Sequence, residues 1–132
     1  MTNAVGSIPS SLESFLSSPK QMLIDGDWVA ATSGKNFAVC NPATEETIAQ
    51  VAEGEAADID LAVSAARRAF DAGPWARMTP SERGKLIWKV GDLIEQHNDE
   101  LAQLETVDNG KPYSVAKVAD VPLAADMFRY MA

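Results

Sequence analysis

The sequence predicts an α/β fold in which short strands come first and helices follow. Over residues 22–52, apolar residues stand in short runs separated by turn-forming Gly, Pro, Asn and Asp, which is typical of strands. After Gly54, apolar residues recur every three or four positions, which is the spacing of amphipathic helices. The chain has 132 residues, of which 46% are hydrophobic and 23% charged, so its size and composition are those of one globular domain.

Residues 1–20 precede the first predicted strand and are rich in serine. They lack the basic and apolar regions of a secretory signal. We expect a flexible tail over this range. Alternatively, Leu12, Phe15 and Leu16 form a short helical turn that docks on a partner surface.

Turn signals divide the strand-forming part. Asp25-Gly26-Asp27 provides a positive φ angle at Gly26, and we expect it to join strands at residues 22–24 and 28–29 into a hairpin. A further turn is expected at Ser33-Gly34-Lys35. Strands at residues 37–40 and 47–52 follow, and the first of them ends at Asn41-Pro42 because Pro42 has no amide hydrogen to donate.

Two amphipathic helices are predicted next. The first is stopped by Gly73-Pro74, and the second begins with Thr79-Pro80-Ser81-Glu82, which has the spacing of a capping box with proline at the first helical position. The expected apolar faces consist of Ile59, Ala62, Val63, Ala66 and Phe70 in the first helix, and of Leu86, Ile87, Val90, Leu93 and Ile94 in the second.

Two more helical stretches complete the chain. Asn98 is expected to cap a third helix that ends at Asn109-Gly110. A fourth stretch begins near Ser114, and Asp120-Val121-Pro122 either kinks it or restarts it with Asp120 as cap. The chain stops at Ala132 inside this apolar helical pattern, from which we expect an N-terminal piece of a longer protein with apolar surface left uncovered.

Composition narrows the classes of function. The formal net charge of −8 argues against nucleic-acid binding, which needs clustered Lys and Arg. The single cysteine excludes an internal disulfide framework and fits a reducing compartment, so we expect a cytoplasmic protein. No apolar run is long enough for a transmembrane helix, so no membrane partner is expected.

No catalytic constellation can be assembled from the residues alone. Cys40 lies in a predicted strand and is interpreted as a small buried hydrophobe rather than a reactive thiol. His97 is interpreted as a surface histidine near a helix C-terminus. Glu105 and Asp108, three residues apart on one helix, either form a solvated face or act as a pair in acid–base work or cation binding.

Several short strings occur in a distinctive order along the chain. They are Ile24-Asp25-Gly26-Asp27-Trp28, Asn41-Pro42-Ala43-Thr44, Val51-Ala52-Glu53-Gly54, Asp108-Asn109-Gly110-Lys111-Pro112 and Phe128-Arg129-Tyr130. Through them, residues 20–132 closely resemble the N-terminal region of the NAD(P)-dependent aldehyde dehydrogenases. The resemblance implies that residues 21–132 are the N-terminal part of a cofactor-binding domain, incomplete without its Rossmann-like sheet.

The resemblance also implies a covalent mechanism. In that family a cysteine thiolate attacks the aldehyde, hydride passes to the nicotinamide of NAD or NADP, and a glutamate-activated water hydrolyses the thioester. The nucleophile, the base and the cofactor turn lie beyond the matching segment, and Cys40 does not match the nucleophile's motif. We therefore expect no catalytic or cofactor-binding residue here and no activity of this chain alone. The alternative is a non-catalytic product or a partner-binding module.

Two smaller sites carry over by position. The family often holds a monovalent cation near the strand before Asn-Pro, and the matching ligands are Val39, Cys40 and Asp108, although Asp108 alternatively caps the turn after its helix. Leu123, with Ala119 and Met127 a turn away on either side, matches the family's substrate entrance, or else belongs to the core. The resemblance further implies a homo-oligomer acting on an aldehyde, with aromatic aldehydes such as phenylacetaldehyde as one subclass.

Overall fold

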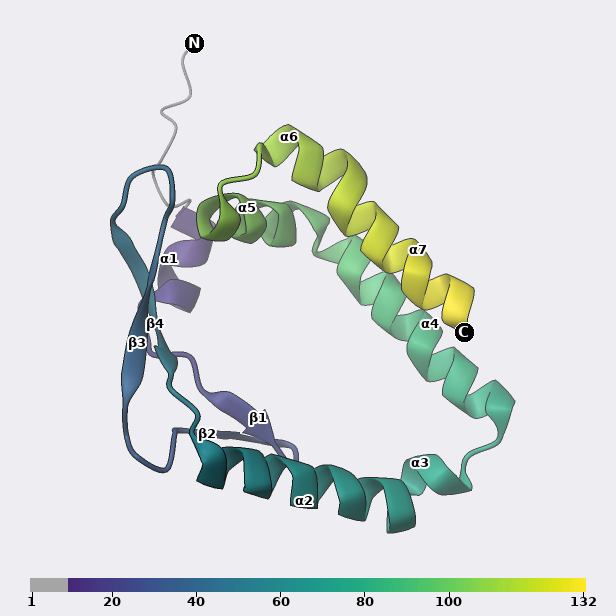
Figure 1. Ribbon diagram of the computed structural model, residues 1–132. Coiled ribbons are helices and arrows are strands. Elements are labelled where there is room, and N and C mark those ends of the chain that lie inside the picture. Colours follow the sequence, from purple (N-terminus) through teal and green to yellow (C-terminus); the bar gives the residue numbers. More distant parts are fainter. Residues whose placement is uncertain (1–9) are drawn as a thin grey trace.

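The computed structural model describes residues 10–132 as short strands followed by helices, in agreement with the predicted α/β class. The elements follow one another around an open arc, in which α7 returns along α4 (Figure 1). In chain order they are α1 (Ser10–Leu16), β1 (Met22–Ile24), β2 (Asp27–Val29), β3 (Asn36–Cys40), β4 (Thr47–Ala52), α2 (Ala56–Ala72), α3 (Pro74–Arg77), α4 (Pro80–Gln96), α5 (Asn98–Asn109), α6 (Tyr113–Val115), the π-helical segment η1 (Ala116–Asp120) and α7 (Val121–Met131).

The first hairpin is confirmed. β1 and β2 pair antiparallel, and Ile24 lies opposite Asp27, so that Asp25 and Gly26 alone make the turn. Both turn residues have positive φ angles, 57° and 89°. This is the turn whose twist matches that of the flanking strands, and it explains why a glycine follows the aspartate.

A second antiparallel hairpin joins β3 to β4. Val39 pairs with Ala49 but Cys40 pairs with Thr47, so Ile48 is an extra residue and makes a β-bulge in β4. The chain segment before β1 also contacts this hairpin, because the Lys20 amide donates to the Gln50 carbonyl at 2.7 Å and the Ala52 amide donates to the Lys20 carbonyl at 2.8 Å.

Helix α1 corrects the prediction of a flexible tail as far as residues 10–20 are concerned. Leu12 is only 1% exposed and Leu16 is also buried, and both pack in one apolar cluster with Ile48 of β4 and Val107 of α5. The energy gained by burying two leucines holds this segment against its own chain, whereas the alternative prediction placed it on a partner. The rest of the predicted tail, residues 1–9, lies outside the described residues.

The apolar face predicted for the first long helix is not covered within the described chain. Ile59, Val63 and Phe70 of α2 are all exposed, whereas Asp58 and Ala65 are buried. The capping box at the start of α4 is confirmed, since the Thr79 hydroxyl accepts from the Glu82 amide and the Glu82 carboxylate accepts from the Thr79 amide.

Helix α5 ends at Asn109-Gly110, as predicted, and Gly110, which follows the last helical residue, has the left-handed φ of 79° that favours glycine at this position. Of the two alternatives at Asp120, the structure favours a distortion over a restart. Asp120 has right-handed helical angles and its side chain makes no capping bond. The N–H of Val121 instead reaches the carbonyl of Ala116, five residues back. Pro122 has no N–H to keep the usual register, and the helix absorbs this with the π-helical segment η1.

Helices α4 and α7 pack closely through small residues. A Cβ atom placed on Gly91 would lie 2.8 Å from the Ala125 carbonyl oxygen, and one on Gly84 would lie 2.5 Å from the Ala132 carbonyl oxygen. Absence of side chains at these two positions therefore sets the distance between the helices. Across residues 10–132, no helix combines the length and the apolar character that crossing a membrane requires.

Candidate functional site

The predicted substrate-entrance residues lie on η1 and α7. Leu123 is 64% exposed and Met127 is 56% exposed, while Ala119 is half-buried. The opposite side of α7 is occupied by packing against α4, where Ala125 is 1% exposed. Leu123 and Met127 therefore form an apolar stripe that is accessible in this chain.

A shallow hollow of about 440 Å³ lies between α4, α5 and α7. Its walls are mostly apolar, and its acidic part comes from the last turns of α5. The residues that line it are Ile94, Leu101, Leu104, Glu105, Asp108, Asn109, Val121 and Ala124. The structure thus brings Asp108 close to the beginning of α7, although the predicted entrance residues do not line this hollow.

The predicted cation ligands come from two element ends that the fold brings together. Val39 of β3 packs against the cluster that contains Val107, the residue before Asp108. A Cβ on Gly110 would lie 3.0 Å from the ring of Pro42, so the turn after β3 also meets the end of α5. Within residues 10–132 no three His, Cys, Asp or Glu side chains are grouped to hold a metal ion.

Cys40 is exposed, which corrects its interpretation as a buried hydrophobe. The neighbouring Val39 faces the core, and side chains alternate along a strand, so Cys40 points to the other side. Its sulfur lies 3.9 Å from the Thr47 hydroxyl. His97 is a surface histidine as predicted, 3.2 Å from Glu100.

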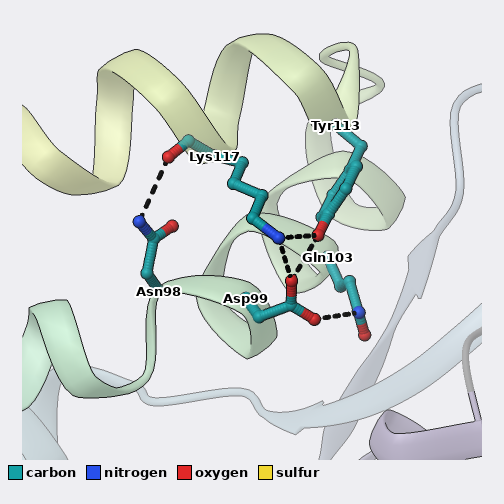
Figure 2. A network of polar contacts seen from close by, with 5 residues as sticks. All are labelled: Asn98, Asp99, Gln103, Tyr113 and Lys117. Carbon is teal, nitrogen blue, oxygen red and sulfur yellow. Dashed lines mark hydrogen bonds and ion pairs between the residues drawn. The ribbon is translucent and has the colours of Figure 1, made fainter.

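A polar network fastens α5 to α6 and η1 (Figure 2). Asp99 accepts from the Lys117 ammonium at 2.5 Å, from Gln103 at 2.8 Å and from the Tyr113 hydroxyl. The Lys117 ammonium also donates to the Tyr113 hydroxyl at 3.0 Å. These bonds, from Lys117 first and then Tyr113, lower the pKa of Asp99, and the Asp99 carboxylate raises the pKa of Lys117.

Beside this network, Asn98 does not act as predicted. It is the first residue of α5 rather than its cap, and its side-chain N–H donates to the Lys117 carbonyl at 3.1 Å. No local pattern in the sequence indicated a role for Asp99 or Tyr113. Their 14-residue separation carries no local signal, because only the return of the chain through Gly110 and Pro112 places them side by side.

A sequence model of the aldehyde dehydrogenase family matches residues 28–132, and the chain belongs to this family. The DhaS protein of Bacillus subtilis is 47% identical over 132 residues, which are 100% of this chain and 27% of that protein. A mitochondrial benzaldehyde dehydrogenase of Antirrhinum majus is 49% identical over 85% of this chain and 21% of its own length.

Solved structures agree with this assignment. The NAD+ complex of an aldehyde dehydrogenase from Bacillus cereus matches with a TM-score of 0.91 and 49% identity, over 96% of this chain and 26% of that one. The chain therefore spans about a quarter of the length of the relatives it matches. The fold described above is that of the N-terminal part of the family.

Proposed function

We propose that this chain provides the N-terminal part of an enzyme that oxidises an aldehyde to a carboxylic acid with NAD or NADP. The match to the Bacillus cereus aldehyde dehydrogenase carries the proposal, because that structure is an NAD+ complex and its fold agrees over 96% of this chain. In this proposal residues 21–132 form part of a cofactor-binding domain, and the enzyme is a cytoplasmic homo-oligomer.

We further propose that these 132 residues do not oxidise aldehydes by themselves. A thiol nucleophile needs a neighbouring base or cation to form the thiolate. The sulfur of Cys40 has the Thr47 hydroxyl as its contact, and a hydroxyl does not supply that activation. The residues of this chain instead contribute a supporting layer and two peripheral sites.

The first of these sites is the substrate entrance. The accessible stripe of Ala119, Leu123 and Met127 would receive the apolar part of the aldehyde, because burying its surface there removes that surface from water. The benzaldehyde dehydrogenase among the relatives supports an aromatic aldehyde, and phenylacetaldehyde is the substrate we would choose first. The second site is a monovalent cation bound by the Val39 and Cys40 carbonyls and the Asp108 carboxylate.

A hybrid enzyme tests the proposal. Residues 1–132 are joined to the part of the Bacillus cereus enzyme that follows its matching segment, and NADH formation from phenylacetaldehyde is followed by absorbance. We expect the folded hybrid to be active and the isolated chain to be inactive. A folded hybrid without activity would contradict the proposed function, and an active isolated chain would contradict the supporting role.

The entrance is tested in the same hybrid with Leu123→Gln. The polar side chain should raise KM for phenylacetaldehyde by about tenfold, because the loss of apolar contact is on the order of 1–2 kcal/mol. Val118→Gln is the matched control, since Val118 is 75% exposed on η1 and lies outside the stripe. Equal effects of the two substitutions would refute this entrance.

A further inference from the structure

We propose that Asn98 is a positioning residue. Its side-chain amide replaces the N–H that Pro122 lacks and thereby holds η1 in its π-helical conformation. This conformation sets the direction of the stripe formed by Ala119, Leu123 and Met127. This inference concerns α5 and η1 alone. Only its consequence for substrate binding rests on the proposed function.

The hydrogen-bond register of η1 leaves one carbonyl without a backbone donor. The Val121 N–H donates to the carbonyl of Ala116, five residues earlier. In the same register the next residue, Pro122, would donate to the carbonyl of Lys117, but proline has no N–H. α7 is an α-helix. In α-helical spacing each N–H bonds four residues back, so the N–H of Leu123 would fall on Ala119, beyond the Lys117 carbonyl.

A side-chain donor takes this place. The Asn98 Nδ2 group lies 3.1 Å from the Lys117 carbonyl oxygen, although the two residues are 19 positions apart (Figure 2). The other atom of the amide, Oδ1, is buried without a hydrogen-bond partner. Rotating the amide by half a turn would place two acceptors together, so the Lys117 carbonyl determines which end of the Asn98 amide faces η1.

The conformation of η1 affects the direction of the apolar stripe on α7. A π-helical segment rotates the residues after it relative to those before it, because it inserts extra chain into the turn. Ala119 lies inside η1, whereas Leu123 and Met127 lie after it. If η1 relaxed to an ordinary α-helix, the positions of Leu123 and Met127 relative to Ala119 and α5 would change. A single polar contact on α5 thus controls an apolar surface on α7.

Hydrogen exchange at the Val121 amide tests the inference through a double-mutant cycle. In the chain with Pro122, Asn98→Ala should increase the exchange rate about tenfold, because the Lys117 carbonyl loses its hydrogen bond and no other donor replaces it. In the Pro122→Ala background the backbone N–H is restored, and Asn98→Ala should change the rate by less than about twofold. Equal effects in the two backgrounds would overturn the inference.

Two further variants separate the amide donor from the neighbouring charges. Asn98→Asp has nearly the same shape but presents only acceptors to the Lys117 carbonyl, so it should behave like Asn98→Ala and also be rescued by Pro122→Ala. Lys117→Ala removes the ammonium bound to Asp99 and keeps the carbonyl, so its effect should be the same in both backgrounds. Wild-type protection in Asn98→Asp would overturn the inference.

The cycle is measured on the 132-residue chain. If the isolated chain shows no protected amides in α7, the cycle is measured on the hybrid enzyme instead. In the active hybrid, Asn98→Asp should raise KM for phenylacetaldehyde several-fold with little change in kcat, and Pro122→Ala should restore it. An unchanged KM would refute the effect on the stripe. An inactive hybrid would count against the proposed function, while the exchange cycle would still decide the role of Asn98.

Discussion

Asp58 is a buried carboxylate that ties the turn before β3 to the start of α2. Its Oδ1 accepts from the Thr32 hydroxyl at 2.5 Å and from the Thr32 amide at 2.9 Å, and its Oδ2 accepts from the Glu55 amide at 2.8 Å. These donors, the Thr32 hydroxyl first, lower the pKa of Asp58 below 3.8. The ionised form is therefore the one that stabilises the fold.

The substitution Asp58→Asn should destabilise the chain at neutral pH and much less in acid. Because the folded pKa is the lower one, the contribution of Asp58 is fully present above the unfolded value of 3.8 and is lost as the pH falls through the folded pKa. Thermal unfolding of both proteins is measured from about pH 7 to about pH 2, because this range covers the usual titration of a carboxyl group. A difference in Tm that stays constant down to the lowest pH would contradict the assignment.

At the scale of elements, the contact between α4 and α7 is set by glycine. Helix propensity alone predicts that Gly91→Ala stabilises α4 by about 1 kcal/mol. The structure predicts the opposite sign, because the new Cβ would lie 2.8 Å from the Ala125 carbonyl oxygen, a backbone atom that cannot move without α7. Overpacking of this kind costs about 1–3 kcal/mol and exceeds the gain in propensity.

Urea unfolding of Gly91→Ala should therefore show a lower midpoint than the wild type. Lys89→Ala compared with Lys89→Gly is the matched control, because Lys89 is exposed on the same helix and this pair measures the difference in propensity between alanine and glycine without the contact. A midpoint that rises for Gly91→Ala would show that α4 and α7 do not approach as closely as described.

The ends of elements were more predictable than their contacts. The turn at Asp25-Gly26 and the capping box at Thr79 depend on bonds between residues at most three positions apart, so the local sequence indicates them. Which face of α2 becomes buried depends on which other segments of the folded chain pack against this helix. Periodicity correctly located the helix and the apolar side that contains Ile59 and Phe70, and this side is exposed in the described chain.

At the scale of the whole molecule, the chain carries more surface than a compact protein of its mass. Its accessible surface is 9263 Å². A compact monomer of 14.1 kDa exposes about 6,700 Å². The excess includes large apolar side chains of α2 and α7, such as Phe70 at 74% and Leu123 at 64%. The faces that the sequence predicted to be uncovered are therefore accessible.

The isolated chain should consequently bind a hydrophobic dye and increase its fluorescence severalfold relative to a compact protein. Leu123→Gln combined with Met127→Gln should reduce this signal, because both side chains lie on the accessible stripe of α7. Lys85→Ala, an exposed change on α4, should leave it unchanged. Fluorescence as weak as that of a compact protein would mean that these apolar faces are covered in solution.

The candidate sites also differ in how far the local sequence indicated them. Resemblance to a family identified the candidate site residues Val39, Cys40, Asp108 and Leu123. The local patterns around them predicted only strand or helix and indicated no functional role. The bond from Asn98 to Lys117 could not be predicted, because the two residues are 19 positions apart and the chain between them must first fold back on α5. Its only trace in the sequence is Pro122, which signals that one helical carbonyl needs another donor.

The sequence by itself located the two hairpins and the long helices α2, α4, α5 and α7, and it identified the aldehyde dehydrogenase family. Only the tertiary structure decided that Leu12 is buried, that Cys40 is exposed and that Asn98 serves η1. The physical reason is the distance along the sequence over which each kind of interaction acts. Caps and turns are satisfied within a few residues of the same segment, whereas burial and cross-helix hydrogen bonds depend on surfaces that meet only after distant segments have packed.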